Sequence, residues 1–412
     1  MRVTLFAWRN LWRRKRRTLI TGFSIGFGIM LAVTFTGTGD YGYTNMINAG
    51  ANMGFGHVTI ERQGYNLSPG LDKPVENSEQ VRDIVLKIEG VNNAYVRIMG
   101  QAMFASANKT VGGMFLAVHP KEESAEHNLF IRSMVSGEML SSSDNRDVVI
   151  GTHLAKKLNL RLGKKLIYTT TDANGEIVSA ISRVTGIFET GVKEIDGGLV
   201  MLPINTVRNQ IGYKNDEATL VAALVNDQRY TQAVRDRVAR RLNAKNVEIL
   251  TWKQTQGDMA GIVAMDRGSN YISQILIGLL IAAGIFNTLL MSVLERRREF
   301  GIMMAVGMTP ATLFKLIMTE SLWLAAVGII FGVIITTPWY WYLYNIGIDF
   351  TGAIGDDYSA GGVLVDPVMK IRLFKESIIS ILSGVFLLTL ASGLYPAWKA
   401  GHIPPVQSLM QR

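Results

Sequence analysis

The sequence predicts an α-helical membrane protein with four transmembrane helices and a large α+β extracytoplasmic domain. Four apolar runs are each long enough to cross a hydrocarbon core of roughly 30 Å as a helix. A polar stretch of about 230 residues follows the first run and is long enough to bury its own core. Three basic clusters, at residues 13–17, 296–298 and 399–412, fall on one side only if both chain ends are cytoplasmic.

Composition supports this class and excludes others. The chain has 412 residues, 48% of them hydrophobic, a net charge of +9 and no cysteine. A disordered or disulfide-framed protein is therefore excluded, as are thiol nucleophiles and zinc-thiolate sites. The densest basic cluster, residues 13–17, directly precedes an apolar run, which favours contact with anionic lipid headgroups over nucleic acid.

The N-terminal residues 1–17 predict an amphipathic helix on the inner membrane surface, because Leu5, Trp8 and Trp12 recur at helical spacing between arginines. The first crossing is expected at residues 18–39. Its Gly22 and Gly26 form a GxxxG spacing that permits close helix packing. The same stretch matches G-x-S-x-G, but that motif needs a preceding strand in a soluble sheet, so packing is favoured over a catalytic serine.

Residues 40–267 are expected to form the extracytoplasmic domain. Apolar periodicity predicts two βαβ units that flank an insertion, which is typical of a split ferredoxin-like lobe at about 40–117 and 217–267. The first unit is a strand near 58–60, a helix at 78–89 and a strand at 95–104, and the second is a strand at 219–225, a helix at 228–243 and a strand at 247–251.

The insertion, about residues 118–216, is expected to be a β-rich sublobe. Strands at 165–171 and 177–188 flank Asn174 and Gly175, a strong hairpin signal. The remaining crossings are expected at 268–294, 312–338 and 376–396.

Other segments connect these crossings. An outer loop at 339–375 begins with four aromatic residues, which suit a membrane interface, and a cytoplasmic tail covers 397–412.

Residues 295–311 are expected to form a short cytoplasmic segment between the second and third crossings. Three consecutive arginines, Arg296 to Arg298, are costly to move across a membrane. As a helix, the segment would have an apolar side that faces bilayer or protein and a charged side that a soluble partner can bind. The apolar side would contain Phe300, Met303, Met304 and Val306, and the charged side Glu295, Arg297, Arg298 and Glu299.

Several polar or small residues within the crossings have candidate roles. Glu320 lies about two turns into its helix, where a carboxylate either stays near the inner headgroups or packs against the segment at residues 295–311 or another helix; the second is favoured. Asn287 and Thr288 are placed to bond across helices, and Gly328 and Gly332 allow another close approach.

The sequence contains no catalytic or metal constellation that we assign. No G-x-x-x-x-G-K-[ST] motif occurs, so the chain is not expected to hydrolyse ATP alone. Glu123 and His127 would share a face at i, i+4 if residues 119–127 were helical. A native metal site would need further ligands, and the charges there fit a solvated connecting helix equally well.

One motif has family-level specificity. Residues 295–307 read Glu-Arg-x-Arg-Glu-x-Gly-x-x-x-Ala-x-Gly, and a helix bearing Glu320 and Ser321 follows. Together with residues 7–19, 148–158 and 395–406, this order resembles the FtsX/MacB-like family of ABC transporter permeases, and most closely its lipoprotein-releasing (LolC/LolE-type) members.

The resemblance implies that the cytoplasmic segment docks in a separate ATPase subunit, which binds ATP and Mg, while this chain binds no cofactor and is not an enzyme by itself. Gly301 is expected to allow a tight turn, and Ala305 and Gly307 to let the partner approach. The coupling residues would be Glu295, Arg296, Arg297, Arg298, Glu299, Gly301, Met304, Ala305 and Gly307.

The resemblance also implies a multi-pass protein of the cell inner membrane, with its large domain in the periplasm. A second permease subunit, either a copy or a homologue, would be a partner, as would membrane lipids and a periplasmic lipoprotein carrier or adaptor. The implied function is to couple the ATPase to periplasmic movements that release lipoprotein or lipid-linked cargo. Alternatives are a tripartite efflux permease (MacB-like) and a mechanotransmitting regulator of periplasmic cell-wall hydrolases (FtsX-like).

Overall fold

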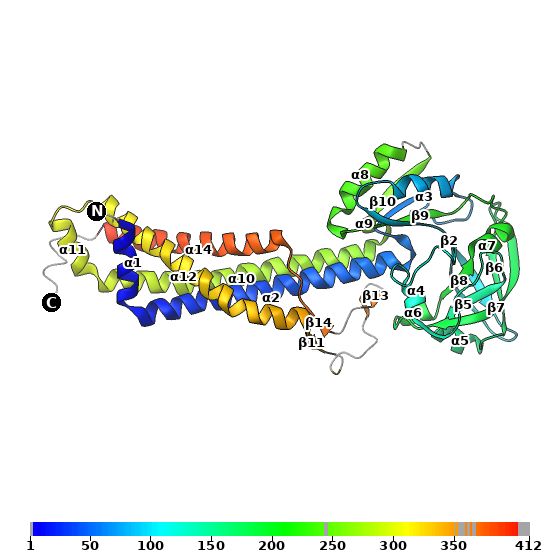
Figure 1. Cartoon of the computed structure of the whole chain (residues 1–412), viewed down its shortest axis with the longest axis horizontal. Helices are drawn as coiled ribbons and strands as arrows, with labels where there is room; N and C mark the ends of the chain where they lie inside the picture. Colours follow the sequence, from blue (N-terminus) through cyan, green and yellow to red (C-terminus); the bar gives the residue numbers. More distant parts are fainter. Residues whose placement is uncertain are drawn as a thin grey trace. The chain divides into compact units, whose positions relative to one another are not determined.

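The computed structural model describes residues 3–242, 246–350, 352, 359–360, 363–364 and 368–402. The chain divides into two compact units, which are described separately below (Figure 1). The helical unit comprises residues 1–42, 265–349 and 368–412, and the sheet unit comprises residues 43–264 and 350–367.

The helical unit confirms the predicted number of crossings. Within the described residues, four helices are long and apolar enough to span a membrane. They are α2 (Lys15–Gly50), α10 (Gly257–Glu295), α12 (Pro310–Asn345) and α14 (Lys375–Gly401), and two shorter helices, α1 (Val3–Arg13) and α11 (Arg297–Ala305), accompany them. Helix α12 packs against both α14 and α1.

Several helix ends differ from the prediction, because hydropathy marks only the most apolar part of a longer helix. Helix α2 continues to Gly50 and α10 begins at Gly257, although the extracytoplasmic domain was expected at residues 40–267. Helix α14 continues to Gly401, although a cytoplasmic tail was expected from residue 397.

The N-terminal helix stops at Arg13 rather than residue 17, because the chain turns at Arg14 and the Thr18 hydroxyl donates to the Leu11 carbonyl over 2.6 Å. Helix α12 continues to Asn345, although a loop was expected from residue 339. Aromatic rings stack there at helical spacing and favour further turns: Trp339 on Tyr342, with centroids 6.2 Å apart, and Tyr340 on Tyr344, 5.8 Å apart.

Helices α2 and α12 cross at four glycines. A Cβ added at Gly26 would lie 2.9 Å from the Gly332 backbone nitrogen, and one added at Gly332 would lie 2.5 Å from Ile29 Cδ1. At Gly22 and Gly328 a Cβ would likewise meet side chains of the opposite helix, at 3.1 Å and 2.6 Å. The structure therefore brings the two predicted small-residue pairs to one crossing, where only hydrogen fits.

In the sheet unit, two βαβ units form the predicted ferredoxin-like lobe. The strand order is β10-β1-β9-β2, with antiparallel neighbours throughout, and α3 and α8 pack against the sheet and each other. The elements are β1 (Val58–Arg62), α3 (Ser78–Leu86), β2 (Val91–Ala105), β9 (Leu220–Val225), α8 (Thr231–Leu242) and β10 (Val247–Thr251).

The insertion is rich in strands, as predicted. The predicted hairpin is present, since Thr171 pairs with Ile177 at its turn. The sheet continues in the order β2-β3-β8-β5-β7-β4, with β6 paired to β2 and β7. The strands are β3 (Thr110–Val118), β4 (Met134–Gly137), β5 (Asp147–Gly151), β6 (Lys165–Thr171), β7 (Ile177–Phe188) and β8 (Leu199–Pro203), with helices α4 (Leu129–Arg132), α5 (Thr152–Leu158), α6 (Lys193–Asp196) and α7 (Ile204–Ile211).

Short elements complete the described chain. A π-helical turn (Ala51–Phe55) follows α2, a 3-10 turn (Gln228–Tyr230) precedes α8, and α9 (Trp252–Thr255) follows β10. Two small pairings are β11 (Ile348–Asp349) with β14 (Val368–Met369), and β12 (Ser359–Ala360) with β13 (Val363–Leu364).

The border between the two lobes differs from the predicted residue 118. Strand β2 pairs with β9 through residues 91–97 and with β3 through residues 98–105, so the β-rich sublobe begins within β2. Buried residues of both lobes, such as Val58 and Val148, also belong to one hydrophobic core. Alternation along a strand reports which face is buried but not where its partner changes, which explains the error.

Candidate functional site

The predicted coupling residues lie where α10 ends and α12 begins. Helix α10 ends at Glu295, Arg296 leaves helical geometry with φ −102° and ψ 13°, and α11 runs to Ala305. Gly307 then adopts φ +104°, a conformation that favours glycine, and turns the chain toward α12. The tight turn is thus at Gly307, whereas Gly301, where we expected it, is buried inside α11.

A buried ion pair ties this segment to α12. Arg296 Nη1 lies 3.0 Å and 3.3 Å from the two carboxylate oxygens of Glu320, and both side chains are 9% exposed. The amide of Asn10 on α1 donates to Glu320 over 3.0 Å, and Arg296 Nε donates to Glu299 over 3.0 Å. Glu320 therefore faces protein, where it joins α12 to the break before α11 and to α1.

The buried side of α11 packs into a hydrophobic cluster. Phe300 is 1% exposed, and the Arg296 guanidinium lies over its ring at 4.8 Å. Met303 and Met304 are half-buried against the same cluster. Its other buried members come from α1, α10, α12 and α14: Ala7, Val293, Leu313, Leu316, Ile317, Ala397 and Ala400.

The other side of α11 is uncovered in this chain. Arg297, Arg298, Ala305 and Gly307 are exposed. Val306, which we expected on the apolar side with Phe300, lies just past the helix end and is 84% exposed. Ile302 is 47% exposed, so arginines and apolar side chains share one accessible surface, here called the docking surface and defined by Arg297, Arg298, Ile302, Ala305, Val306 and Gly307.

The basic start of the chain contacts the acidic residues of the coupling segment. Glu295 pairs with Arg14 and, over 3.2 Å, with Arg17, and Glu299 pairs with Arg13 over 3.4 Å. Sequence reasoning assigned these arginines to topology and lipid only. The available signal was the i, i+4 spacing of the two glutamates, which places both on one side of a helix.

The two polar residues of α10 are placed differently. Thr288 Oγ1 lies 3.4 Å from Thr21 Oγ1 of α2, so it contacts a neighbouring helix as expected. Asn287 lies on the exposed side of α10 rather than between helices.

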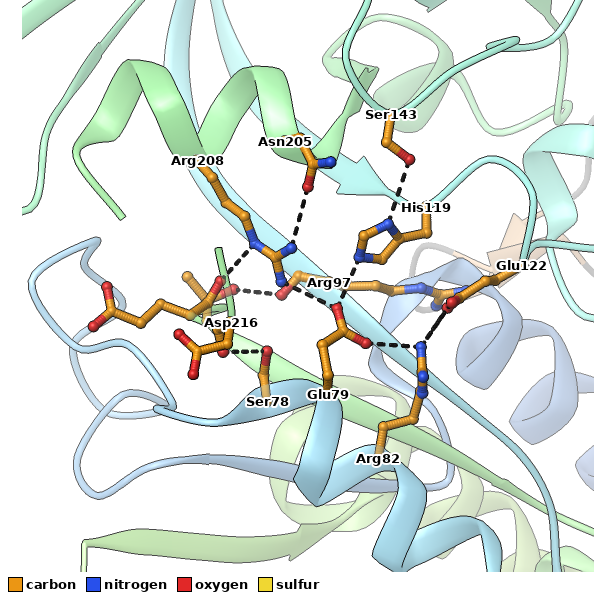
Figure 2. Close-up of polar contacts among 12 residues, drawn as sticks. Ser78, Glu79, Arg82, Arg97, His119, Glu122, Ser143, Asn205, Arg208 and Asp216 are labelled. Carbon is orange, nitrogen blue, oxygen red and sulfur yellow. Dashed lines mark hydrogen bonds and ion pairs between the residues drawn. The ribbon is translucent and has the colours of Figure 1, made fainter. Parts of the chain in front are cut away.

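In the sheet unit, a charged network joins the two lobes (Figure 2). Glu79 of α3 accepts from Arg82 over 2.8 Å and from Arg208 of α7 over 3.3 Å, and its Oε1 lies 2.9 Å from His119 Nε2. Burial opposes the charge of Glu79, but the His119 hydrogen bond and the nearby cations hold the pKa of this carboxyl below its ordinary value. Arg82 also binds Glu122 over 2.7 Å.

The segment considered for a metal has another role. Residues 119–127 form turns rather than a helix, and Glu123 makes a fully buried two-bond pair with Arg97, at 3.0 Å and 2.8 Å. His127 contacts Ser124, with 3.1 Å between Nδ1 and Oγ. Among the described residues, no three His, Asp or Glu side chains are grouped so that they could hold a metal.

A second carboxylate pair was not anticipated. Glu61 on β1 stands opposite Glu248 on β10 and is 2% exposed. Burial, and then the negative charge of Glu248, raise the pKa of Glu61 to about 7. One of its carboxylate oxygens has no hydrogen-bond partner in the described structure.

Two family models match the chain. Residues 18–241 match the MacB-like periplasmic core domain, and residues 271–405 match the FtsX-like permease C-terminal region. The periplasmic region of MacB from Actinobacillus actinomycetemcomitans, a solved structure, is 15% identical with a TM-score of 0.34 and covers 48% of this chain and 90% of its own.

Several curated proteins are similar over long stretches. The lipoprotein-releasing system transmembrane protein LolC of Xylella fastidiosa is 23% identical over 76% of this chain and 78% of its own length. An uncharacterised ABC transporter permease of Methanocaldococcus jannaschii is 21% identical over 99% and 97%. The pyoverdine export ATP-binding/permease protein PvdT of Pseudomonas aeruginosa is 24% identical over 98% of this chain and 58% of its own.

Proposed function

This chain belongs to the family of ABC transporter permeases that combine a MacB-like periplasmic core domain with an FtsX-like C-terminal region, and we propose that it transmits the work of a separate ATPase subunit to its periplasmic domain. That subunit would bind ATP and Mg. One observation supports this role directly: α11 is anchored on one side by Phe300 and the Arg296–Glu320 pair, and presents the docking surface on the other.

The anchoring makes α11 suitable for passing on a force. Breaking a buried ion pair by removing one partner costs about 3–5 kcal/mol, so the Arg296–Glu320 pair resists sliding of α11 past α12. The cluster around Phe300 links α11 to four further helices. Helix α10 runs without a break from Gly257 to Glu295, so a displacement at its cytoplasmic end is carried along a continuous helix to residues of the periplasmic domain.

Substitutions on the docking surface test this role. Replacing Val306 with Asp puts a charge on its most exposed apolar side chain and should abolish co-purification with the ATPase, because the charge must be desolvated on binding. Val306→Thr keeps the shape without a charge and serves as the matched control. If Val306→Asp retains both the complex and wild-type ATP hydrolysis, α11 is not the docking element.

We further propose that the cargo is a lipoprotein or another lipid-linked molecule and that a second permease subunit, a copy or a homologue, completes the transporter in the inner membrane. The similarity to LolC over about three quarters of both chains supports this cargo class. The similarity to PvdT, a pyoverdine export ATP-binding/permease protein, supports the alternative of an efflux permease.

Reconstituted permease and ATPase distinguish these cargos. An acylated lipoprotein should stimulate ATP hydrolysis, whereas the same protein without its acyl chains should not. Stimulation by a soluble small molecule, with none by the acylated protein, would favour efflux instead.

A further inference from the structure

Two adjoining cavities lie between helices of the membrane unit. The first, here called the arginine cavity, has a volume of about 210 Å³ and is lined by residues of α1, α2, α10, α11 and α12. Its charged lining consists of four arginines and two glutamates: Arg13, Arg14, Arg17, Arg296, Glu299 and Glu320. Because Glu295 also pairs with Arg14 and Arg17, one positive charge remains in excess.

Arg17 has unused capacity to bind an anion in this cavity. Its Nη1 donates to Glu295 over 3.2 Å, but its Nη2 is shielded from solvent and has no hydrogen-bond partner in the described structure. A buried donor without a partner costs about 1–3 kcal/mol. A phosphate is a suitable acceptor, because the planar guanidinium matches its oxygens and the excess positive charge attracts it.

The second cavity, here called the apolar groove, has a volume of about 400 Å³ between α2 and α10. Thr21 and Thr288 line both cavities, so the groove begins where the arginine cavity ends. From Ile20 to Leu31 it follows α2 over about 16 Å, at 1.5 Å per residue. That length is half of a hydrocarbon core of roughly 30 Å, which is the depth of one leaflet.

We propose that one anionic phospholipid of the cytoplasmic leaflet binds here, with its phosphate in the arginine cavity and an acyl chain in the apolar groove. A headgroup site beside a groove one leaflet deep fits a phospholipid better than a soluble anion, which would leave the groove unfilled. Basic pockets between transmembrane helices on the cytoplasmic side suit anionic headgroups in general.

A lipid bound at this location would stabilise contacts between the helices that surround it. The arginines that would contact the phosphate also pair with Glu295 and Glu299. A bound phosphate would neutralise the excess positive charge, accept from the unpaired Nη2 of Arg17, and hold α1, α2 and the start of α11 together.

Lipid binding to the full chain tests the proposal without the ATPase, so its outcome is independent of the transport function. The delipidated protein in detergent is titrated with phosphatidylglycerol or phosphatidylcholine of the same acyl chains, and bound lipid is counted by native mass spectrometry. One phosphatidylglycerol should bind preferentially. Arg17→Gln should lower its affinity roughly fivefold or more, because each arginine near an anionic headgroup contributes about that factor. Arg16→Gln, the exposed neighbour outside both cavities, should not.

A second variant tests the groove and does not depend on the arginines. Gly284 lines it, and a Cβ there would meet open space, so Gly284→Leu should fold normally yet exclude the acyl chain. Gly268→Leu, also open but outside the groove, is its control. Any of three results would overturn the proposal. These are equal binding of both lipids, equal losses of phosphatidylglycerol affinity in Arg17→Gln and Arg16→Gln, and unchanged affinity in Gly284→Leu. Displacement of the lipid by glycerol phosphate at similar concentration would show that the site takes a soluble phosphate only.

Discussion

Replacing Glu61 with Gln should stabilise the periplasmic domain at alkaline pH. Glu61 is almost fully buried on β1, opposite Glu248 on β10, and its pKa is raised from an ordinary 4.5 to about 7. A protonated Glu61 can donate to Glu248, whereas two carboxylates repel each other. Gln keeps the shape and can also donate, but it never becomes charged.

The sign and size of the change in the free energy of unfolding follow from the linkage between protonation of Glu61 and folding. Because the folded-state pKa is raised, the folded protein holds the Glu61 proton more tightly than the unfolded chain does. This contribution is fully present below pH 4.5 and is lost as the pH rises through about 7. At about 1.36 kcal/mol per pKa unit, the loss at pH 8 is about 3 kcal/mol at most, and screening through half-buried Glu248 reduces it to about 2 kcal/mol. At pH 5 the stability lost is below about 1 kcal/mol.

Thermal unfolding of the full chain in detergent measures the effect. At 2–4 °C per kcal/mol for a domain of this size, Glu61→Gln should raise the unfolding temperature of the periplasmic domain by about 4–8 °C at pH 8 and by about 2 °C or less at pH 5. Glu176→Gln, at an exposed hairpin position, removes the same charge and should change neither value. An equal shift of Glu61→Gln at both pH values, or no shift at pH 8, would refute the reasoning.

Four further predictions follow from particular contacts. Glu123→Gln should destabilise the periplasmic domain by about 3–5 kcal/mol in denaturant unfolding, because its arginine partner stays buried and unbalanced. Gly26→Leu should cost about 1–3 kcal/mol and lower the yield of monodisperse protein, since its Cβ would meet the α12 backbone at 2.9 Å. Glu320→Gln should assemble with the ATPase but lose cargo-stimulated hydrolysis; unchanged hydrolysis would refute its coupling role. Because the chain has no cysteine, Lys164→Cys should react with an impermeant thiol reagent outside the cytoplasm and Thr309→Cys should not.

Sequence reasoning could not identify contacts between residues that are far apart along the chain. Arg296 and Glu320 are 24 residues apart, and Arg17 and Glu295 are 278 apart, yet each pair forms an ion pair. No local pattern specifies such partners, because they depend on how helices pack. Sequence reasoning therefore named Arg296 only among the coupling residues and assigned it no partner, although it is buried.

Errors at the ends of elements have a related cause. Val306 fits an apolar helical side by spacing, but the helix ends at Ala305 and leaves it exposed. The continuation of α12 past residue 338 depends on aromatic pairs that hydropathy does not measure.

Local sequence patterns were enough to predict the four crossings, the two βαβ units and the hairpin at Asn174 and Gly175, because hydropathy, periodicity and turn chemistry act over a few neighbouring residues. The tertiary structure alone decided which charges are buried together, where strand β2 changes partners and which sides of α11 are anchored or open. These features arise from packing between segments far apart in the chain, where burial selects the partner of each charge and each strand edge.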